Sequence, residues 1–446
     1  MNQVVHAISR LNPGALASLL LIFAGLILYG ANSAAGAALL SMVLLALLVL
    51  ACANRSSQAL SAFARANWLS ILAFGVFLAV AFGASLVHWR PQVGDLPAST
   101  RWGGPTMALS PYRSIEGIAA LFGPAAAFML GSLFSAEREQ RDWIGRWVAL
   151  LTLLYCAYAL WLFFAAQSAG RLDAGISSAN GAADVFIILA LTAAAIVVRG
   201  ARGHLSGAAR RTTDGPRTPA LLRTPFALGA LILSFTCLLL TASRAGLVAG
   251  AIGVLVFASA IGAQMMKGQG GRRGMLAIPV LVMAAALAVL FWRGGDDVLE
   301  RFALADQDLA IRRQIALAHW PFFSESPVFG QGLGAYYELN TLAAHPENWT
   351  ALRPAGSVHN IYIQALEETG LVGLGLLGLM LATPLERAMR RGFGPHSGAE
   401  YAAAAFAGAI VLFAHGFTDF GLQTPAIAAL FAFVLGAFAP PYRKRA

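Results

Sequence analysis

Charged residues are scarce in this sequence. Asp, Glu, Lys and Arg together make up 12% of its 446 residues, against 58% hydrophobic residues, and no water-soluble fold has a core that could hide such an apolar fraction. Cysteine is scarce too. Cys52, Cys156 and Cys237 all fall within apolar runs, which argues against a disulfide framework and a thiolate metal site. The composition therefore predicts an integral membrane protein.

Apolar runs supply the helices that such a protein needs. Runs of roughly 17 to 22 residues recur along the chain, and each can cross about 30 Å of hydrocarbon as a helix. They predict an all-α polytopic membrane protein with about twelve transmembrane helices. The predicted spans are Leu16–Gly30, Ala34–Ala53, Trp68–Val87, Ile115–Ser135, Val148–Ala166, Ala182–Val198, Pro225–Thr241, Gly246–Ala263, Met275–Trp292, Asn360–Ala382, Tyr401–Gly416 and Pro425–Ala439.

The basic residues give these helices a direction. If loops alternate between two sides, 21 of the 31 Lys and Arg residues fall on the side that holds both chain ends, and 10 fall on the other. The positive-inside rule places the richer side in the cytoplasm. The net charge of +10 is then a topology signal, and we expect no nucleic-acid partner. We also expect the first helix to be retained, although Ala31–Ala35 resembles a signal-peptide cleavage site.

One outer loop is long enough to form a structure of its own. It covers about 65 residues from Arg293 to Val358, and it divides the chain into helices one to nine (1–292), the loop (293–358), and helices ten to twelve with the tail (359–446). Leu309–Trp320 is predicted as a short amphipathic helix. The glycine-rich segment Gly330–Gly334 follows Pro327 rather than a strand, which favours a bent loop over a dinucleotide site.

Glycines elsewhere are interpreted as packing positions. Gly246 and Gly250 are four residues apart, and a second group comprises Gly370, Gly373, Gly375 and Gly378. Small residues at such spacing let helices approach closely within a membrane.

The stretch Phe226–Ile261 would be about 54 Å long as one helix, which is too long for one crossing. We expect two helices joined by a tight turn at Arg244, on the outer face. A guanidinium there can bind a phosphate or carboxylate in a forked geometry. The alternative is an interfacial anchor that reaches for lipid headgroups.

Further polar residues fall on the same face. Arg171 precedes the polar segment Ser177–Gly181, which contains Asn180 and is otherwise typical of an ordinary loop. His359 and Asn360 open the tenth span and precede Glu368; a histidine there can accept a proton or simply begin a helix. His415 and Asp419 are four residues apart and are expected on one helix face, as a functional site or as a structural pair. Motifs typical of catalytic metal sites are missing here, so no metal and no cofactor are expected.

Three segments resemble the O-antigen ligase and polymerase superfamily of bacterial glycosyltransferases. They are Thr241–Gly246, Arg312 with Pro327–Gly334, and His359–Tyr362 with Glu368–Gly373. The resemblance implies a GT-C-like fold in the bacterial inner membrane, with both termini cytoplasmic and the active site facing the periplasm. It also implies metal-independent, inverting transfer of an undecaprenyl-diphosphate-linked saccharide to lipid A core, with membrane lipid around the protein. The catalytic residues that it implies are His359, Arg244, Glu368 and Asp419, and the substrate-binding residues are Arg171, Asn180, Arg312, Asn360, Ser243 and His415.

In these roles, His359 deprotonates the acceptor hydroxyl, Glu368 orients His359, and arginines stabilise the diphosphate. Three alternatives stay open. A polymerase would use another lipid-linked repeat unit as acceptor. A secondary transporter would line a path with Arg244, His415 and Asp419, although the large outer loop and the lack of a visible inverted repeat argue against it. A silent scaffold would tolerate loss of Arg244 and His359.

Overall fold

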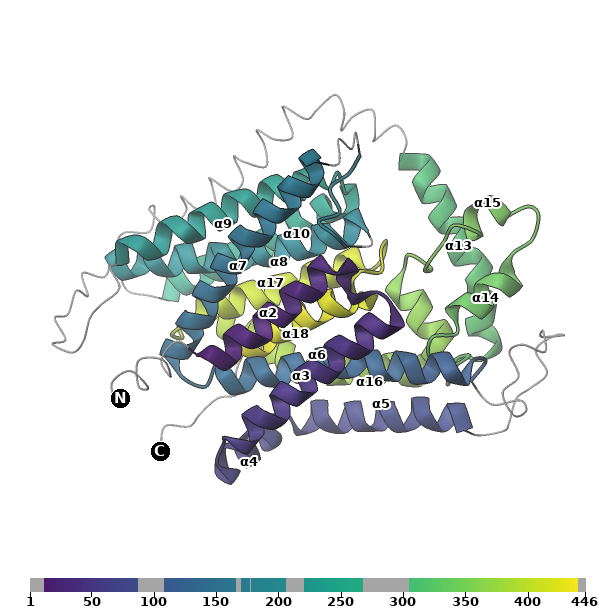
Figure 1. Ribbon diagram of the computed structural model, residues 1–446, viewed down its shortest axis with the longest axis horizontal. Coiled ribbons are helices and arrows are strands. Elements are labelled where there is room, and N and C mark those ends of the chain that lie inside the picture. The colour runs from purple at the N-terminus through teal and green to yellow at the C-terminus, as the bar shows by residue number, and fades with distance from the viewer. Residues whose placement is uncertain are drawn as a thin grey trace.

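The computed structural model describes residues 12–86, 108–165, 170–176, 178–205, 220–267 and 305–439 (Figure 1). In these ranges every regular element is helical. The helices are α2 (Pro13–Ile27), α3 (Ala34–Ala53), α4 (Ser57–Ala66), α5 (Trp68–Leu86), α6 (Pro111–Phe134), α7 (Arg138–Ala165), α8 (Ala179–Leu205), α9 (Ala220–Leu240), α10 (Arg244–Lys267), α13 (Ala305–Glu325), α14 (Tyr336–Ala343), α15 (Trp349–Leu352), α16 (Ile361–Gly392), α17 (Ala399–His415) and α18 (Pro425–Phe438), with 3-10 turns at Tyr29–Ala31 and Gly421–Gln423.

Most of these helices have the length and composition of membrane spans. Seven of the described helices are long and apolar enough to cross a membrane, and α2, α9, α17 and α18 are shorter apolar helices. Each of the eleven corresponds to a predicted span. The predicted ninth span, Met275–Trp292, lies outside the described residues, as do residues 293–304 of the large loop and Ser177. The chain is therefore an α-helical, multi-pass membrane protein.

Helix α8 lies at the centre of the bundle. Its apolar window is entirely buried, and it packs against α9, α17, α7 and α10. A Cβ atom at Gly246 would lie 2.7 Å from the Cβ of Ala183, and one at Gly250 would lie 3.3 Å from Ile187. The prediction that these two glycines allow close packing is confirmed, because α10 can approach α8 only where it lacks side chains.

Helix α16 is broken at Gly370, whereas Asn360–Ala382 was predicted as one continuous span. Gly370 has φ 63° and ψ −170°, a combination that is accessible essentially only to glycine. A Cβ atom there would also lie 2.3 Å from the carbonyl oxygen of Val328. The interpretation of the second glycine group as packing positions is wrong for Gly375 and Gly378, because a Cβ atom at either would meet nothing within 4 Å.

The glycine-rich segment of the large loop fills this break. The amides of Gln331 and Gly332 donate to the carbonyls of Glu367 and Glu368, at 2.7 and 2.9 Å. The amides of Leu371 and Val372 donate in turn to the carbonyls of Pro327 and Val328, at 2.9 and 3.1 Å. Backbone groups released by the broken helix are thus paired again within the protein, as a membrane environment requires.

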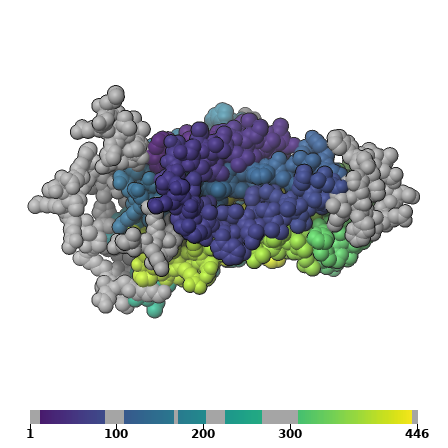
Figure 2. All heavy atoms as spheres, turned by 90° about the horizontal axis from the view of Figure 1, so that it is seen from below, coloured from purple at the N-terminus to yellow at the C-terminus, as the bar shows by residue number. Residues whose placement is uncertain are grey.

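The described part of the large loop forms a small helical subdomain at one end of the bundle (Figure 1). Its helices α13, α14 and α15 enclose a core that includes Ile315, Tyr336 and Leu352. The predicted short helix at Leu309–Trp320 is confirmed as part of α13, and Gly330, Gly332 and Gly334 all have positive φ, which confirms a bent loop. Figure 2, seen from below, shows the N-terminal helices in purple to blue across the middle of that face, with this subdomain in green toward one end. We call this end the site end.

Candidate active site at one end of the bundle

A tight turn between α9 and α10 lies at the site end. Helix α9 ends at Leu240 and α10 begins at Arg244, so the turn consists of Thr241, Ala242 and Ser243. The prediction of two helices joined by a tight turn is confirmed, with the turn directly before Arg244. The Oγ of Ser243 accepts a hydrogen bond from the amide of Gly246 at 3.1 Å, which caps α10. The half-buried Arg244 is therefore held on the first turn of a helix.

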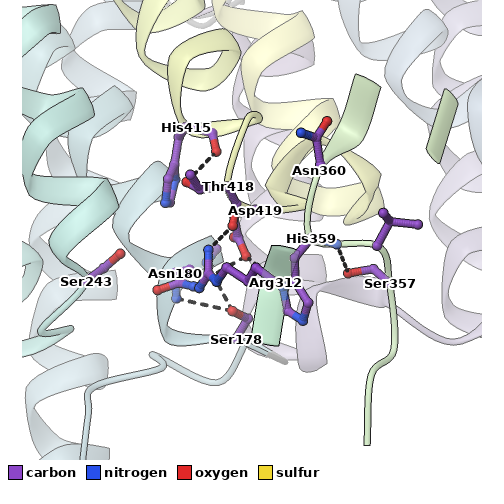
Figure 3. A network of polar contacts seen from close by, with 12 residues as sticks. Ser178, Asn180, Ser243, Arg312, Ser357, His359, Asn360, His415, Thr418 and Asp419 are labelled. Carbon is purple, nitrogen blue, oxygen red and sulfur yellow. Dashed lines mark hydrogen bonds and ion pairs between the residues drawn. The ribbon is translucent and has the colours of Figure 1, made fainter. Parts of the chain in front are cut away.

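Arg171 connects this turn to α8. Its Nε donates to the carbonyl of Thr241 at 2.8 Å, and one terminal nitrogen donates to Oδ1 of Asn180 at 2.6 Å. Asn180 lies in the first turn of α8, which Ser178 caps by accepting from the amides of Asn180 and Gly181. The Nδ2 of Asn180 then donates to Oδ1 of Asp419 at 3.3 Å (Figure 3). The amide bridges a guanidinium and a carboxylate.

Asp419 lies beside the ring of His359. The Nδ1 atom of His359 is 3.6 Å from Oδ1 of Asp419, and the exposed fractions of the two side chains are 26% and 1%. His359 has φ 54°, in the left-handed region that few side chains adopt. Its partly open ring therefore stands at a constrained backbone position, with a buried carboxylate on one side.

The surroundings of Asp419 favour its ionised form. Burial by itself would raise the pKa of this carboxyl, but the ring of His359 and the positive charges of His415 and Arg312 outweigh it and lower the pKa. The guanidinium of Arg312, on α13, also donates a hydrogen bond to the carbonyl of Thr418. The subdomain thereby contributes a cation to the same cluster.

His415 is buried beneath this cluster rather than beside Asp419 on one helix. Helix α17 ends at His415, and the chain turns at Gly416 so that the amide of Thr418 bonds back to the carbonyl of His415 at 2.9 Å. The prediction of a shared helix face is therefore wrong, although the two side chains do come close. The Nδ1 of His415 lies 2.7 Å from Oδ1 of Asp184, on α8, and both side chains are almost fully buried.

Asp184, His415 and Asp419 together could hold a metal ion, since one ligand atom from each lies within 4.8 Å of the others. Three cationic or basic side chains, Arg171, Arg312 and His359, adjoin this group through Asn180, Thr418 and Asp419. Carboxylates with such neighbours already have positive charge nearby, which favours an ion-pair network over a cation site.

Glu368 and Asn360 have structural partners. Glu368 accepts hydrogen bonds from the amide of Gly334, at 2.9 Å, and from Gln364, at 3.2 Å. Glu368, which was predicted to orient His359, is linked to the residue before that histidine through Gln364, which accepts from the amide of Val358 at 3.2 Å. Asn360 caps α16 by accepting from the amides of Tyr362 and Ile363.

The structure thus joins Arg171, Asn180, Arg312, His359 and Asp419 in one network and places His415 directly beneath it. Ser243 and Asn360 lie to either side of it (Figure 3). Sequence reasoning did not single out Asp184 or Gln364. The spacing could have indicated Asp184, because it follows Asn180 by four residues at the start of a predicted helix and therefore shares a helix face with it.

Comparison with known proteins gives this network a context. Residues 229–378 match the family model described as O-Antigen ligase. The Exopolysaccharide production protein ExoQ of Rhizobium meliloti (strain 1021) is 28% identical over 225 residues, which are 49% of this chain and 51% of that protein. The chain thus spans about half the length of the curated relative that it matches. The resemblance to the O-antigen ligase and polymerase superfamily is confirmed.

The family match covers some of the candidate site residues. Arg244, Arg312, His359 and Glu368 lie within residues 229–378, whereas Arg171, Asn180, His415 and Asp419 lie outside them. Tertiary contacts bring Arg171, Asn180 and Asp419 together with Arg312 and His359.

Proposed function

We propose that this protein is an O-antigen ligase-like glycosyltransferase that moves an undecaprenyl-diphosphate-linked glycan onto lipid A core. The observation that carries the proposal is the polar network of Arg171, Asn180, Asp419, His359 and Arg312 at one end of an apolar helical bundle. A lipid-linked donor has an apolar tail and a charged headgroup. The polar network can bind the headgroup, and the apolar bundle and the surrounding lipid can accommodate the tail.

Arginines take the charge-stabilising part of the reaction. The leaving group is a diphosphate, and guanidinium groups bind phosphate oxygens in pairs. Arg244, with Arg171 and Arg312 near the same end of the bundle, supplies positive charge where negative charge develops. We therefore propose that no metal ion takes part.

His359 is the proposed general base. As the acceptor hydroxyl attacks the anomeric carbon, the bond from that carbon to the phosphate oxygen breaks, the carrier diphosphate leaves with the electron pair, and the hydroxyl proton passes to His359. Attack opposite the leaving group inverts the anomeric configuration. The ionised Asp419, 3.6 Å from His359, stabilises the imidazolium that forms.

The proposed setting is the bacterial inner membrane, with the site end facing the periplasm and both termini in the cytoplasm. The distribution of basic residues supports this direction, because the sequence predicts 21 of the 31 on the cytoplasmic side.

A polymerase is the second candidate. It is favoured by the name of the similar protein, an exopolysaccharide production protein. Both reactions need the same donor site and differ in the acceptor, which for a polymerase is another lipid-linked repeat unit.

The test uses the purified full-length protein in proteoliposomes with a defined undecaprenyl-diphosphate oligosaccharide. Lipid A core and a second lipid-linked unit are offered as acceptors in separate reactions, and the product is followed by mass spectrometry. We expect extended lipid A core; extension of the lipid-linked unit alone would assign the polymerase. Both the ligase and the polymerase proposals would be contradicted if the protein transported a solute in the absence of lipid-linked sugar and transferred glycan to neither acceptor.

A matched pair of histidine variants tests the base. His359→Ala is expected to abolish transfer while donor binding persists. His345→Ala, at an exposed position of the subdomain, is expected to retain activity.

A further inference from the structure

Helix α8 and the end of α17 are joined by two parallel contacts. In the first, Asn180 donates to Asp419 at 3.3 Å; in the second, Asp184 pairs with His415 at 2.7 Å. Asn180 and Asp184 are one helical turn apart and share a face of α8. The two contacts therefore lie one above the other, with the Asp184–His415 pair deeper in the bundle.

The deeper pair is shut off from any substrate. The exposed fraction of His415 is 1% and that of Asp184 is 2%. An acid–imidazole pair buried within an apolar bundle carries a large desolvation cost, and ionisable groups at such depth are kept for a role in most membrane proteins. A direct contact with the donor or acceptor is therefore not the role of His415.

The geometry points to a positioning role: Asp184 and His415 hold the turn that carries Asp419, and thereby the carboxylate that faces His359. This inference rests on the proposed function. His415 fixes the turn through its carbonyl, which accepts both from the amide of Thr418, at 2.9 Å, and from its hydroxyl, at 3.1 Å. Asp184 fixes His415 through its ring.

Gly421 supplies independent evidence that Asp184 reaches this turn. A Cβ atom at Gly421 would lie 1.9 Å from Oδ2 of Asp184, a separation that real atoms do not adopt. The Asp184 carboxylate thus occupies the space that a side chain at position 421 would need. The turn from His415 to Gly421 is therefore shaped around Asp184.

The test measures what Asp419 does to His359. The charged groups around His359 are Asp419 on the turn, Arg312 on α13, Arg171 before α8, and the Asp184–His415 pair between α8 and α17. If the turn loses its support, Asp419 stabilises the imidazolium of His359 less, and the acid limb of the pH–rate profile moves to lower pH. A role in folding alone would leave that limb in place.

Two variants disturb the pair by different means. Asp184→Asn removes the charge, and Gly421→Ala displaces the carboxylate while keeping every charge. For both we expect kcat to fall about 10- to 100-fold, by analogy with the loss of the partners that orient metal ligands, while KM for the donor changes little and the acid limb shifts downward. Gly408→Ala, on α17, is the control, because a Cβ atom there would lie 3.8 Å from Ile188, an ordinary contact.

A second readout does not depend on transfer. The rate at which diethyl pyrocarbonate modifies His359, resolved by mass spectrometry across pH, reports the protonation of that ring even if the protein proves to have another activity. The same downward shift in both variants supports the inference. Wild-type profiles in both variants would overturn it, and so would loss of activity on chelation with recovery on adding a divalent cation, because the three side chains would then form a metal site.

Discussion

The side chain of Asn180 donates a hydrogen bond to the carboxylate of Asp419, at 3.3 Å, across 239 residues of sequence. The other end of the same amide accepts from Arg171 at 2.6 Å. Because an amide has one accepting and one donating end, its orientation is set by the cation on one side and the anion on the other.

Asn180→Asp is expected to disable this bridge. It replaces the donor by a second carboxylate next to Asp419, and like charges at such a distance disfavour joint ionisation. Leaving a buried carboxylate without its donor costs about 1 to 3 kcal/mol. We expect lower thermal stability in detergent. We also expect at least a tenfold loss of glycan transfer, because the transition state loses a similar amount of stabilising free energy. Wild-type transfer by Asn180→Asp would remove Asn180 from the site.

Arg244→Lys is expected to reduce transfer by about 100-fold, because a compact ammonium cannot replace a planar fork at a diphosphate. The measurement is the rate of transfer at saturating donor. Arg353→Lys makes the same change at an exposed position of the subdomain and should leave the rate unaltered. A well-expressed Arg244→Lys variant with a normal rate would contradict the role of Arg244.

Gly370→Ala is expected to destabilise the protein. Backbone strain at this conformation costs about 1 to 3 kcal/mol, and the added carbon would collide with the carbonyl of Val328. The measurement is unfolding in a detergent series. At Gly375, in the same helix, an added Cβ atom would meet nothing within 4 Å. Gly375→Ala is therefore expected to leave the stability unchanged or slightly raised. Equal stability of the two variants would show that α16 is not broken in the membrane.

Asp419 gives the protein a pH-dependent stability. Its pKa is lowered in the folded protein from an ordinary value of 3.8, so its ionisation stabilises the fold above that value, and this contribution is lost as the pH falls through the folded pKa. The stability difference between the wild type and Asp419→Asn should therefore shrink as the pH falls below about 4. A difference that stays undiminished on acidification through this range would contradict the ionised state of Asp419.

The sequence alone determined the class of the fold and the end at which the site lies. The apolar runs are long enough to predict membrane-spanning helices, and Thr-Ala-Ser-Arg at residues 241–244 interrupts an apolar stretch too long for one helix. Run length and interruptions are local properties of the sequence, so they can be read without knowing how the helices pack. The close approach at Gly246 was predictable for the same reason.

Tertiary structure decided which residues meet. The family resemblance implied that Glu368 orients His359, but Glu368 bonds to Gly334 and Gln364, while Asp419 faces the ring. The break at Gly370 exists only because another segment lies against it and pairs its backbone groups. The rotation of each helix about its axis is set by its neighbours, and only that rotation brings Asp184 to His415.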